Sequence, residues 1–418
     1  MVKLFYKLFI ILYPLGVKLV SPFNPKAKAW IKGRQLTFTY LAANICANDR
    51  IVWIHCASLG EFEQGKPLIE QLFKNPAKDY KILVTFFSPS GYEASSQYPF
   101  ADLMAYLPMD SAANATLFLQ LVHPLLVVFV KYEFWYYLLK EVAGRNIPLL
   151  LISGIFRADQ PFFKWYGHWH RQMLPFFTHF FVQNQQAADL LKGVGYNNNV
   201  SVSGDTRFDR VTEIADTFVG IPFIEAFCGN SPIVVAGSTW PDDDKELNHF
   251  ANNNPEIKFI IAPHNIISDR IAQCLQLYTH SATYTQLQQN TLPRHTNTLI
   301  IDNIGMLKQL YKYGTVCYVG GAFGADGVHN VLEPAIYGRP IIFGPTYSKY
   351  IEAIELVDVG GAKSIYNALE LEAVLNTWLQ KGDDYFQASV LSRNYVLSKT
   401  GSTEKIVEYI YKNRLLTS

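Results

Sequence analysis

The strongest chemical signal in this sequence is a glycine-rich stretch, "VCYVGGAFGADGVHNVLEPAIYGRPIIFGP", at residues 316–345. Its pattern predicts a buried strand ending at Gly320 and Gly321, a loop, and a short helix that opens near Asn330. Free N–H groups at a helix start attract phosphate, and Glu333 could accept hydrogen bonds from a ribose. We expect nucleotide binding here, with tight turns alone as the alternative. The spacing matches neither GxGxxG followed by a ribose-binding acid nor a P-loop, which argues against a dinucleotide oxidoreductase or an ATPase.

Three further strand exits are predicted in the same half. "VVAGSTWPDDDKEL" contains small hydroxyl residues that could cap a helix or bind an anion, and both interpretations stay open. "IIAPHNI" and "NIGMLKQLY" are the other two exits. The candidate residues at these exits are Ser238, Thr239, Pro263, His264, Gly305, Met306 and Leu307. The imidazole of His264 could also be merely a capped surface group.

The three aspartates of "WPDDDKEL", Asp242, Asp243 and Asp244, resemble a metal-binding acidic motif. They follow Pro241 at an expected helix start, where the dipole and free N–H groups favour carboxylates. We prefer that interpretation, and predict no metal and no cofactor.

Two glutamates in the first half follow predicted strands. Glu61 lies in "IHCASLGEFEQGKPLIEQL", and because Pro67 fits only a first helical turn or a kink, we expect Glu61 on a loop ahead of the helix. A helix-start glutamate stabilised by the dipole is the alternative. Glu133 lies among aromatic residues in "VKYEFWYY". A buried carboxylate needs a partner, and we expect Arg207 or Arg157.

The chain has 418 residues, so we expect two domains. Because 49% of the residues are hydrophobic and only 17% are charged, we also expect part of the surface to contact something other than water. A net charge of +1 argues against nucleic-acid binding. Five cysteines without metal-ligand spacing indicate reduced core residues.

The first 34 residues contain seven lysines or arginines, and the first acidic residue is Asp49. The uncharged run "LFIILYPLGV" is much shorter than the about 20 residues of a spanning helix. We therefore expect a leader at residues 1–24 that lies on a membrane, with its lysines facing anionic headgroups. A secretory signal and a core helix are the alternatives.

Apolar runs alternate with helical patterns in both halves, which is typical of parallel βα layers. The expected strands are 51–55, 82–86, 125–130, 149–153, 180–183, 233–236, 259–262, 299–302, 316–319 and 340–343. Two doubly wound domains follow, joined near residues 202–210, and an amphipathic helix closes the chain. In such sheets ligands bind beyond the carboxyl ends of the strands, where these candidate residues fall.

Together these segments resemble the 3-deoxy-D-manno-octulosonic acid (Kdo) transferases of lipopolysaccharide synthesis. The motifs that carry the resemblance are "SLGE", "YEFW", "GDTRFD", "AGSTWP", "APH" and "GVHNVLEPAIYGRPIIFGP". The resemblance implies a GT-B fold, with two Rossmann-like domains facing a cleft. It also implies CMP-Kdo as donor, a lipid A precursor (lipid IVA) as acceptor, and attachment to the cytoplasmic face of the inner membrane.

The resemblance also implies roles for single residues. Glu61 matches the general base, Arg207 falls where lysine is common, and Glu133 falls on the second glutamate of the family's "ETE". Lys131 replaces the first of those glutamates, and Trp240 replaces a usual histidine. The residues that match the CMP-binding segments are Ser238, Thr239, Pro263, His264, Gly305, Met306, Leu307, Asn330, Val331, Leu332 and Glu333. His264 replaces or neighbours a family arginine.

We thus expect an acceptor-binding domain at residues 25–207 and a donor-binding domain at 208–418, with the last helix able to pack back on the first. Two alternative functions stay open. One is a GT-B UDP-sugar transferase or epimerase, and the other is a non-catalytic membrane-bound nucleotide-binding protein.

Overall fold

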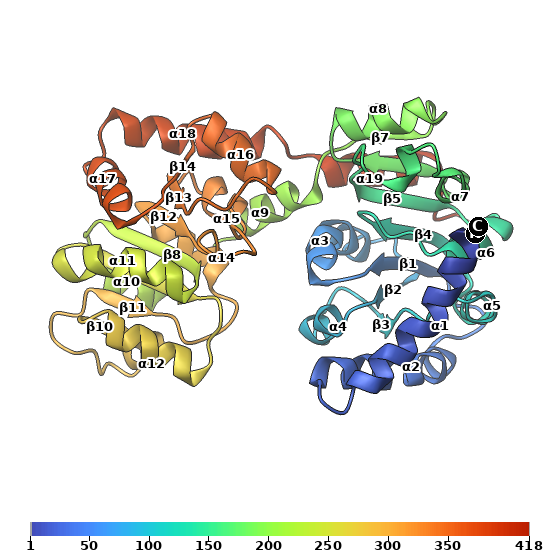
Figure 1. Cartoon of the computed structure of the whole chain (residues 1–418), viewed down its shortest axis with the longest axis horizontal. Coiled ribbons are helices and arrows are strands. Elements are labelled where there is room, and N and C mark those ends of the chain that lie inside the picture. Colours follow the sequence, from blue (N-terminus) through green and yellow to red (C-terminus); the bar gives the residue numbers. More distant parts are fainter. Residues whose placement is uncertain (1, 418) are drawn as a thin grey trace. The chain divides into compact units, whose positions relative to one another are not determined.

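A computed structural model describes residues 2–417 of the chain (Figure 1). The chain forms two compact units, of which the first comprises the residues up to Arg210 together with those from Gly401 on. The second is Val211–Thr400. The boundary thus follows Arg210 instead of residue 207, and the last helix belongs to the first unit.

In the described part of the first unit, seven strands form one parallel sheet in the order β3-β2-β1-β4-β5-β6-β7. The strands are β1 (Ile51–Cys56), β2 (Lys81–Phe86), β3 (Leu103–Tyr106), β4 (Pro124–Val130), β5 (Leu149–Gly154), β6 (His179–Val182) and β7 (Val200–Val202). The order reverses between β1 and β4, because the chain adds strands on one side of β1 and then on the other. This is a doubly wound sheet.

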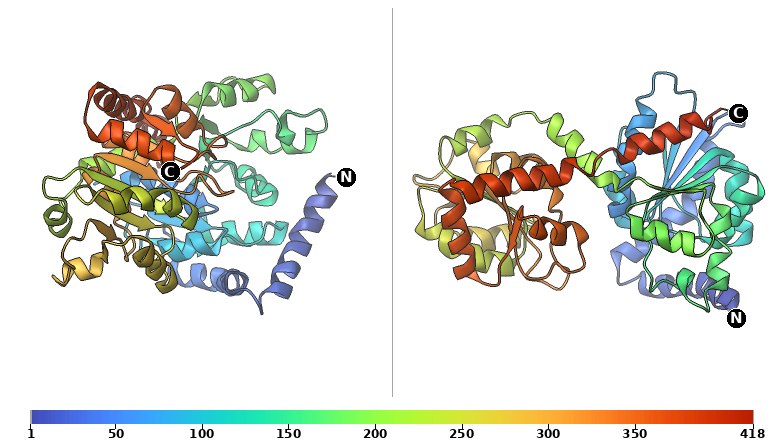
Figure 2. Two further views of the ribbon diagram at one scale, coloured as in Figure 1. Left: turned by 60° about the vertical axis from the view of Figure 1, so that its left-hand side comes forward. Right: turned by 90° about the horizontal axis from the view of Figure 1, so that it is seen from above.

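Helices cover both faces of this sheet. They are α1 (Val2–Val20), α2 (Pro25–Asn44), α3 (Leu59–Phe73), α4 (Pro89–Ser95), α5 (Ala112–Val122), α6 (Tyr136–Gly144), α7 (His168–Arg171), α8 (Gln185–Gly193) and α19 (Ser402–Lys412), with short 3₁₀ turns at Pro161–Phe163 and Leu174–Phe176. A further helix, α9 (Thr206–Asp216), begins in the first unit and ends in the second. The residues of α3 and α19 pack into one core with the even-numbered residues of β1. Residues of α2, α5, α6 and α8 pack into a second core on the opposite face. Figure 2 shows α19, the red helix at the C-terminus, lying against this unit.

The described residues of the second unit form another seven-stranded parallel sheet, in the order β10-β11-β9-β8-β12-β13-β14. Its strands are β8 (Ile233–Thr239), β9 (Lys258–Pro263), β10 (Ser281–Thr283), β11 (Thr298–Ile300), β12 (Val316–Val319), β13 (Ile341–Phe343) and β14 (Ala362–Ser364). Its helices are α10 (Pro222–Cys228), α11 (Pro241–Asn253), α12 (Ser268–Leu277), α13 (Tyr284–Gln288), α14 (Leu307–Leu310), α15 (Leu332–Ile336), α16 (Ile351–Asp358), α17 (Ala368–Leu379) and α18 (Asp383–Leu397), with a 3₁₀ turn at Tyr311–Tyr313. Here the order reverses between β8 and β12.

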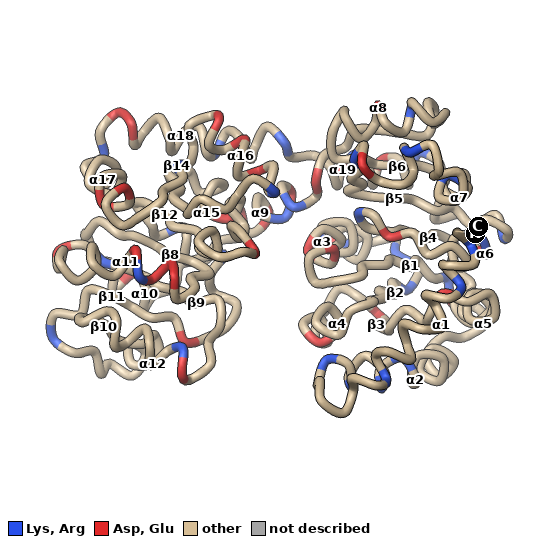
Figure 3. Tube along the Cα trace, in the orientation of Figure 1, with Lys and Arg blue, Asp and Glu red and all other residues tan. Residues whose placement is uncertain are grey.

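The leader forms α1, which is fixed to the first unit along one side only. The Tyr6 hydroxyl donates to the buried carboxylate of Asp110, which also accepts hydrogen bonds from the N–H groups of Tyr137 and Leu138 at the start of α6. The opposite side of α1 exposes a run of apolar side chains, namely Leu4, Phe5, Leu8, Ile11, Leu12, Leu15 and Leu19. Figure 3 shows basic but no acidic positions along α1 and α2.

None of the helices within residues 2–417 is both long enough and apolar enough to cross a bilayer. Four of the five cysteines are buried, Cys46 is exposed, and all five are free thiols.

Candidate functional site

In the first unit, the two candidate glutamates follow the two strands between which the order reverses. Glu61 comes soon after β1, and Glu133 soon after β4. Ligands of open α/β sheets bind in the crevice beyond the strand ends at this reversal. The fold therefore brings to one place two carboxylates that lie far apart in the sequence.

Glu61 lies in the first turn of α3, and the expectation of a loop was wrong. The helix begins at Leu59 because the carbonyl of Ser58 accepts the N–H of Phe62 at 3.0 Å. Pro67 is accommodated inside the helix, with its ring buried. The Glu61 side chain is 5% exposed and accepts a hydrogen bond from the Ser58 hydroxyl. The side chain therefore lies at the positive end of the α3 dipole.

Glu133 is a carboxyl group that holds its proton unusually well. Burial raises its pKa to about 7, the negative charge of Glu61 adds to the rise, and the neighbouring indole of Trp135 partly offsets it. The expected pairing with Arg207 or Arg157 is not formed, since no basic side chain in residues 2–417 makes an ion pair with Glu133. Carboxyl groups in contrasting environments are how enzymes separate an acid from a base.

The backbone is unusual where β4 ends. Lys131 has φ of 74°, in the left-handed region that non-glycine residues rarely adopt. This conformation turns the chain sharply before Glu133. Strained residues of this kind concentrate at functional sites.

Arg207, at the start of α9, is held beside the Glu61 helix by a chain of hydrogen bonds. It pairs with the buried carboxylate of Asp205 at 2.8 Å, and Asp205 also accepts from the Gln64 amide at 3.0 Å. Gln64 lies one turn after Glu61 on α3. Burial raises the pKa of Asp205, but the charge and hydrogen bonds of Arg207 outweigh this and lower it. Asp205 is therefore an anion that orients Arg207.

In the second unit, the candidate residues gather at the equivalent reversal, between β8 and β12. Ser238 has φ of 55°, and a Cβ at Gly320 would overlap its carbonyl group, so the two strand ends approach closely. The Thr239 hydroxyl is buried without a partner among the described protein groups. Neither side chain caps α11. An unpartnered buried donor suits a bound oxyanion, which favours anion binding over capping.

Asp243 ties the glycine loop to the start of α11. Its carboxylate accepts the N–H of Trp240 at 2.8 Å, the N–H of Gly321 at 2.9 Å and the hydroxyl of Tyr318 at 2.7 Å. Burial raises its pKa. The preferred interpretation of this aspartate as a helix-start carboxylate is confirmed, and its second role as a fastener of the loop was not predicted.

The two neighbouring aspartates are also engaged. Asp242 pairs with Lys245 at 2.7 Å on the surface. Asp244 is buried and accepts hydrogen bonds from Arg270 and Tyr278. The three carboxylates thus point to different partners, and residues 2–417 contain no cluster of three or more His, Cys, Asp or Glu residues suited to a metal ion.

Three rings form a stack at the same strand ends. His264 stacks on Trp240 and on His329, with 4.6 Å between ring centroids in each pair. The Trp240 indole N–H donates to His329 Nε2 at 3.1 Å. Burial lowers the pKa of His264, and burial together with His264 lowers that of His329 to about 4. Both imidazoles are therefore neutral at pH 7. His329 was missed by the sequence reasoning, although it stands inside the quoted "GVHN".

The remaining candidates complete this rim. The Asn330 amide donates to Glu333 Oε1 at 3.1 Å, which holds the carboxylate of Glu333 beside the start of α15. Val331 and Leu332 lie between them and are buried. The turn containing Gly305, Met306 and Leu307 lies against β8, because a Cβ at Gly237 would overlap the side chain of Leu307. Pro263 ends β9.

Comparison with solved structures identifies the fold class of the chain. The chain is similar to the UDP-GlcNAc 2-epimerase of Neisseria meningitidis, with a TM-score of 0.61 and 16% identity over 87% of this chain and 100% of that one. It is also similar to the MurG of Acinetobacter baumannii, with a TM-score of 0.53 and 13% identity over 87% and 99% of the two chains. The two units are thus parallel-sheet α/β domains of the GT-B type.

Sequence comparison adds similarity to one family. Residues 32–210 match the family model of 3-deoxy-D-manno-octulosonic-acid transferase (kdotransferase). The chain is 25% identical to 3-deoxy-D-manno-octulosonic acid transferase of Aquifex aeolicus, over 78% of this chain and 86% of the relative. It is 24% identical to that of Haemophilus influenzae, over 90% and 91%. The resemblance to the Kdo transferase family is therefore confirmed.

A further relative, the bifunctional glycosyltransferase/methyltransferase of Fusobacterium nucleatum, is 25% identical over 88% of this chain. The match spans 56% of that relative's length.

Proposed function

We propose that this protein is a glycosyltransferase that moves Kdo from CMP-Kdo to a lipid A precursor. The observation that carries the proposal is the pair Glu61 and Glu133 at the reversal point of the first unit, in a chain related to Kdo transferases. Glu61 lies at a helix start beside the Ser58 hydroxyl, and burial raises the pKa of Glu133 to about 7, so the two carboxyl groups have contrasting environments.

In the proposed reaction the first unit binds the acceptor. A hydroxyl oxygen of the acceptor forms a bond to the anomeric carbon of Kdo, and the proton of that hydroxyl passes to Glu61. The bond from the anomeric carbon to the phosphate oxygen breaks, and CMP leaves with the electron pair. Arg207, oriented by Asp205, offsets negative charge on the transferring group. No covalent intermediate is required.

The second unit is proposed to bind the nucleotide of the donor. The buried Thr239 hydroxyl and the loop fastened by Asp243 suit a phosphate, while Glu333 suits ribose hydroxyls. The leaving group, CMP, carries a single phosphate, so the proposed chemistry needs no metal to clamp a diphosphate.

We also propose that α1 lies on a membrane surface, at the cytoplasmic face of the inner membrane. Its outward run of leucines and phenylalanine is flanked by Lys3, Lys7 and Lys18, the pattern of an interfacial helix. An acceptor with acyl chains resides in such a membrane, so a protein held there meets its substrate.

The test is to incubate the purified protein with CMP-Kdo and a lipid A precursor, and to analyse the lipid by mass spectrometry. We expect a product heavier by one or more Kdo residues, with inhibition by CMP and little by UDP. Inhibition by UDP alone would favour the UDP-sugar enzyme. Binding of CMP without any product would favour the non-catalytic protein.

A further inference from the structure

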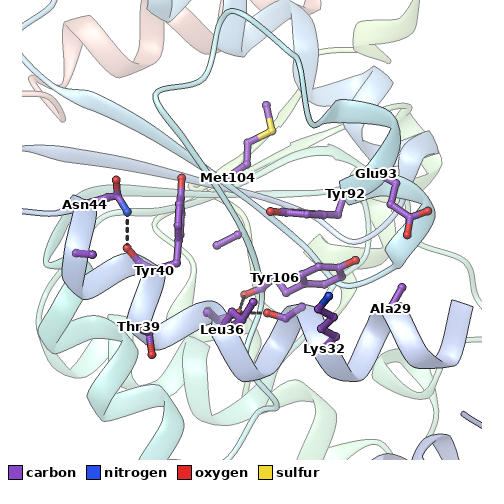
Figure 4. Close-up of a pocket in the computed structure, with 14 residues that line it drawn as sticks. Ala29, Lys32, Leu36, Thr39, Tyr40, Asn44, Tyr92, Glu93, Met104 and Tyr106 are labelled. Carbon is purple, nitrogen blue, oxygen red and sulfur yellow. Dashed lines mark hydrogen bonds between the residues drawn. The ribbon is translucent and has the colours of Figure 1, made fainter.

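The first unit contains a pocket that none of the proposed chemistry uses. It has a volume of about 550 Å³ and lies among α2, α4 and β3 (Figure 4). This volume is in the range of small-molecule sites, roughly 300–1,000 Å³. Its walls include Leu36 and Tyr40 of α2, Tyr92 of α4, and Met104 and Tyr106 of β3.

The inside of the pocket presents mainly carbon. The Thr37 hydroxyl is already hydrogen-bonded to the carbonyl groups of Gly33 and Tyr106, at 3.3 and 3.2 Å. The rings of Tyr92 and Tyr106 stack at 4.4 Å between centroids. Gly33 makes this arrangement possible, since a Cβ there would overlap the Tyr106 ring. Pockets lined mainly by apolar and aromatic side chains bind apolar groups.

Charged groups lie among the pocket residues only at its rim. Lys32 and Glu93 are exposed members of the lining, and Lys28 lies one turn before Lys32 on α2. Leu36 is 56% exposed, so the pocket opens to solvent along the same helix. That helix, α2, packs against α1, and α1 carries the outward run of apolar side chains. A carbon-lined cavity beside lysines and an apolar surface matches an amphiphile with an anionic headgroup.

The helix α4, which contributes a wall of the pocket, also packs against the start of the Glu61 helix. Gly91, in the first turn of α4, packs so closely on Ser58 and Leu59 that a Cβ on it would lie 3.1 Å from the Ser58 carbonyl carbon. The next residue, Tyr92, is a wall of the pocket. One short helix therefore contacts the start of the Glu61 helix with one residue and the pocket with the next.

We propose that this pocket holds one fatty acyl chain of the lipid acceptor while its sugar hydroxyl reaches Glu61. The inference rests on the proposed function and deepens it, because it makes an acyl chain part of acceptor recognition. Burying two methylene groups corresponds to about a tenfold gain in affinity, so a few carbons in the pocket have a measurable effect on acceptor binding.

The experiment compares Leu36→Glu, which places a charge at the opening of the pocket, with Leu117→Glu, an exposed leucine of α5 outside it. Transfer is measured in detergent micelles with the acylated precursor and with the same disaccharide stripped of its acyl chains. We expect Leu36→Glu to raise KM for the acylated acceptor about tenfold or more. Its KM for CMP-Kdo and its activity on the stripped disaccharide should equal those of Leu117→Glu. Equal KM values for the acylated acceptor in both variants would overturn the proposal.

A second measurement separates failure of this inference from failure of the proposed function. Direct binding of a fluorescent long-chain fatty acid is measured for the wild type and both variants, without CMP-Kdo. Binding that Leu36→Glu alone weakens supports an acyl site even if no transfer occurs. Wild-type transfer together with fatty-acid binding unaffected by Leu36→Glu would leave the function intact and overturn the acyl site. Weaker attachment of Leu36→Glu to acceptor-free vesicles, with an unchanged KM for the acylated acceptor, would assign the pocket to a bilayer lipid and overturn the proposal.

Discussion

The charge of Glu61 raises the pKa of Glu133, although the two glutamates follow different strands, β1 and β4. They meet because the sheet order reverses between these strands. One negative charge in the crevice thus makes a second one costly, and only one of the two carboxyl groups need be ionised below pH 7.

Replacing Glu61 by glutamine should abolish transfer with little effect on CMP affinity, because the change removes a proton acceptor but keeps the shape. Loss of general base catalysis costs about 100- to 10,000-fold. Initial rates and calorimetric CMP binding are the measurements. Glu63→Gln, in the same helix and paired with Lys66, is the matched control. A Glu61→Gln rate within a few-fold of wild type would remove Glu61 from the role of base.

The raised pKa of Glu133 makes stability depend on pH. In the unfolded chain this group loses its proton near pH 4.3, but in the folded protein it keeps it up to about pH 7. Between these values the folded state binds more protons, so its contribution to stability is complete below pH 4.3 and is lost as pH rises through 7. Glu133→Gln should therefore be more stable than wild type at pH 8 and equal to it near pH 4.

Thermal unfolding across this pH range tests the prediction, with the exposed Glu404→Gln as control. In a Glu61→Gln background the pH window should move downward, since one cause of the raised pKa is gone. A stability difference between Glu133→Gln and wild type that does not change with pH would contradict the assignment.

Glu333→Ala should weaken CMP binding, because the ribose hydroxyls lose a charged acceptor. A hydrogen bond to a charged group contributes roughly 1.5–3 kcal/mol. Calorimetry of CMP binding is the measurement, and Glu256→Ala, on an exposed loop of the same unit, is the control. Unchanged affinity would place the nucleotide elsewhere.

Introducing charge on the outer side of α1 should release the protein from anionic vesicles. The double variant Leu8→Glu, Leu12→Glu leaves the inward Tyr6 in place. We expect less co-sedimentation than for wild type or for Leu369→Glu, a control in the second unit. High salt should weaken binding of the wild type, because each lysine near the surface contributes about 1 kcal/mol. Equal sedimentation of all three proteins would show that α1 is not the anchor.

Transfer should continue in excess EDTA, and Asp242→Asn should be active, because Asp242 pairs only with Lys245 in the described contacts. A diphosphate clamp would need carboxylates that converge with other oxygen ligands. Loss of activity in EDTA that magnesium or manganese restores would bring back the UDP-sugar enzyme as the leading hypothesis.

The inner strands of both sheets could be predicted from the sequence, but the outer strands could not. All ten predicted strands are present, and the four that were missed, β3, β7, β10 and β14, are the four sheet edges. Inner strands are buried on both faces and show continuous apolar runs. Edge strands are short, with three or four residues each, and β7, β10 and β14 are also partly polar, so they leave no such signal.

For the site, the sequence predicted which residues follow the strands, but not which side chains they contact in the folded protein. Glu61 and Glu133 were singled out because they follow predicted strands, and their roles came from the resemblance to Kdo transferases. Asp205 and Gln64, which hold Arg207 beside α3, are 141 residues apart in the chain. Their pairing depends on tertiary structure that no local pattern encodes.

The return of α19 to the first unit means that the chain passes between the units twice, after Arg210 and before Gly401. Asp209 holds both passages together, since its carboxylate accepts the N–H of Gly401 at 2.6 Å and that of Thr403 at 2.7 Å. The second unit is therefore an insertion within the first. It could be excised as one continuous segment, and a short linker from residue 210 to 401 would restore the first unit. A protease cut after Arg210 would leave the second unit covalently attached to α19 alone, and only the packing of α19 would then hold residues up to 210 to it.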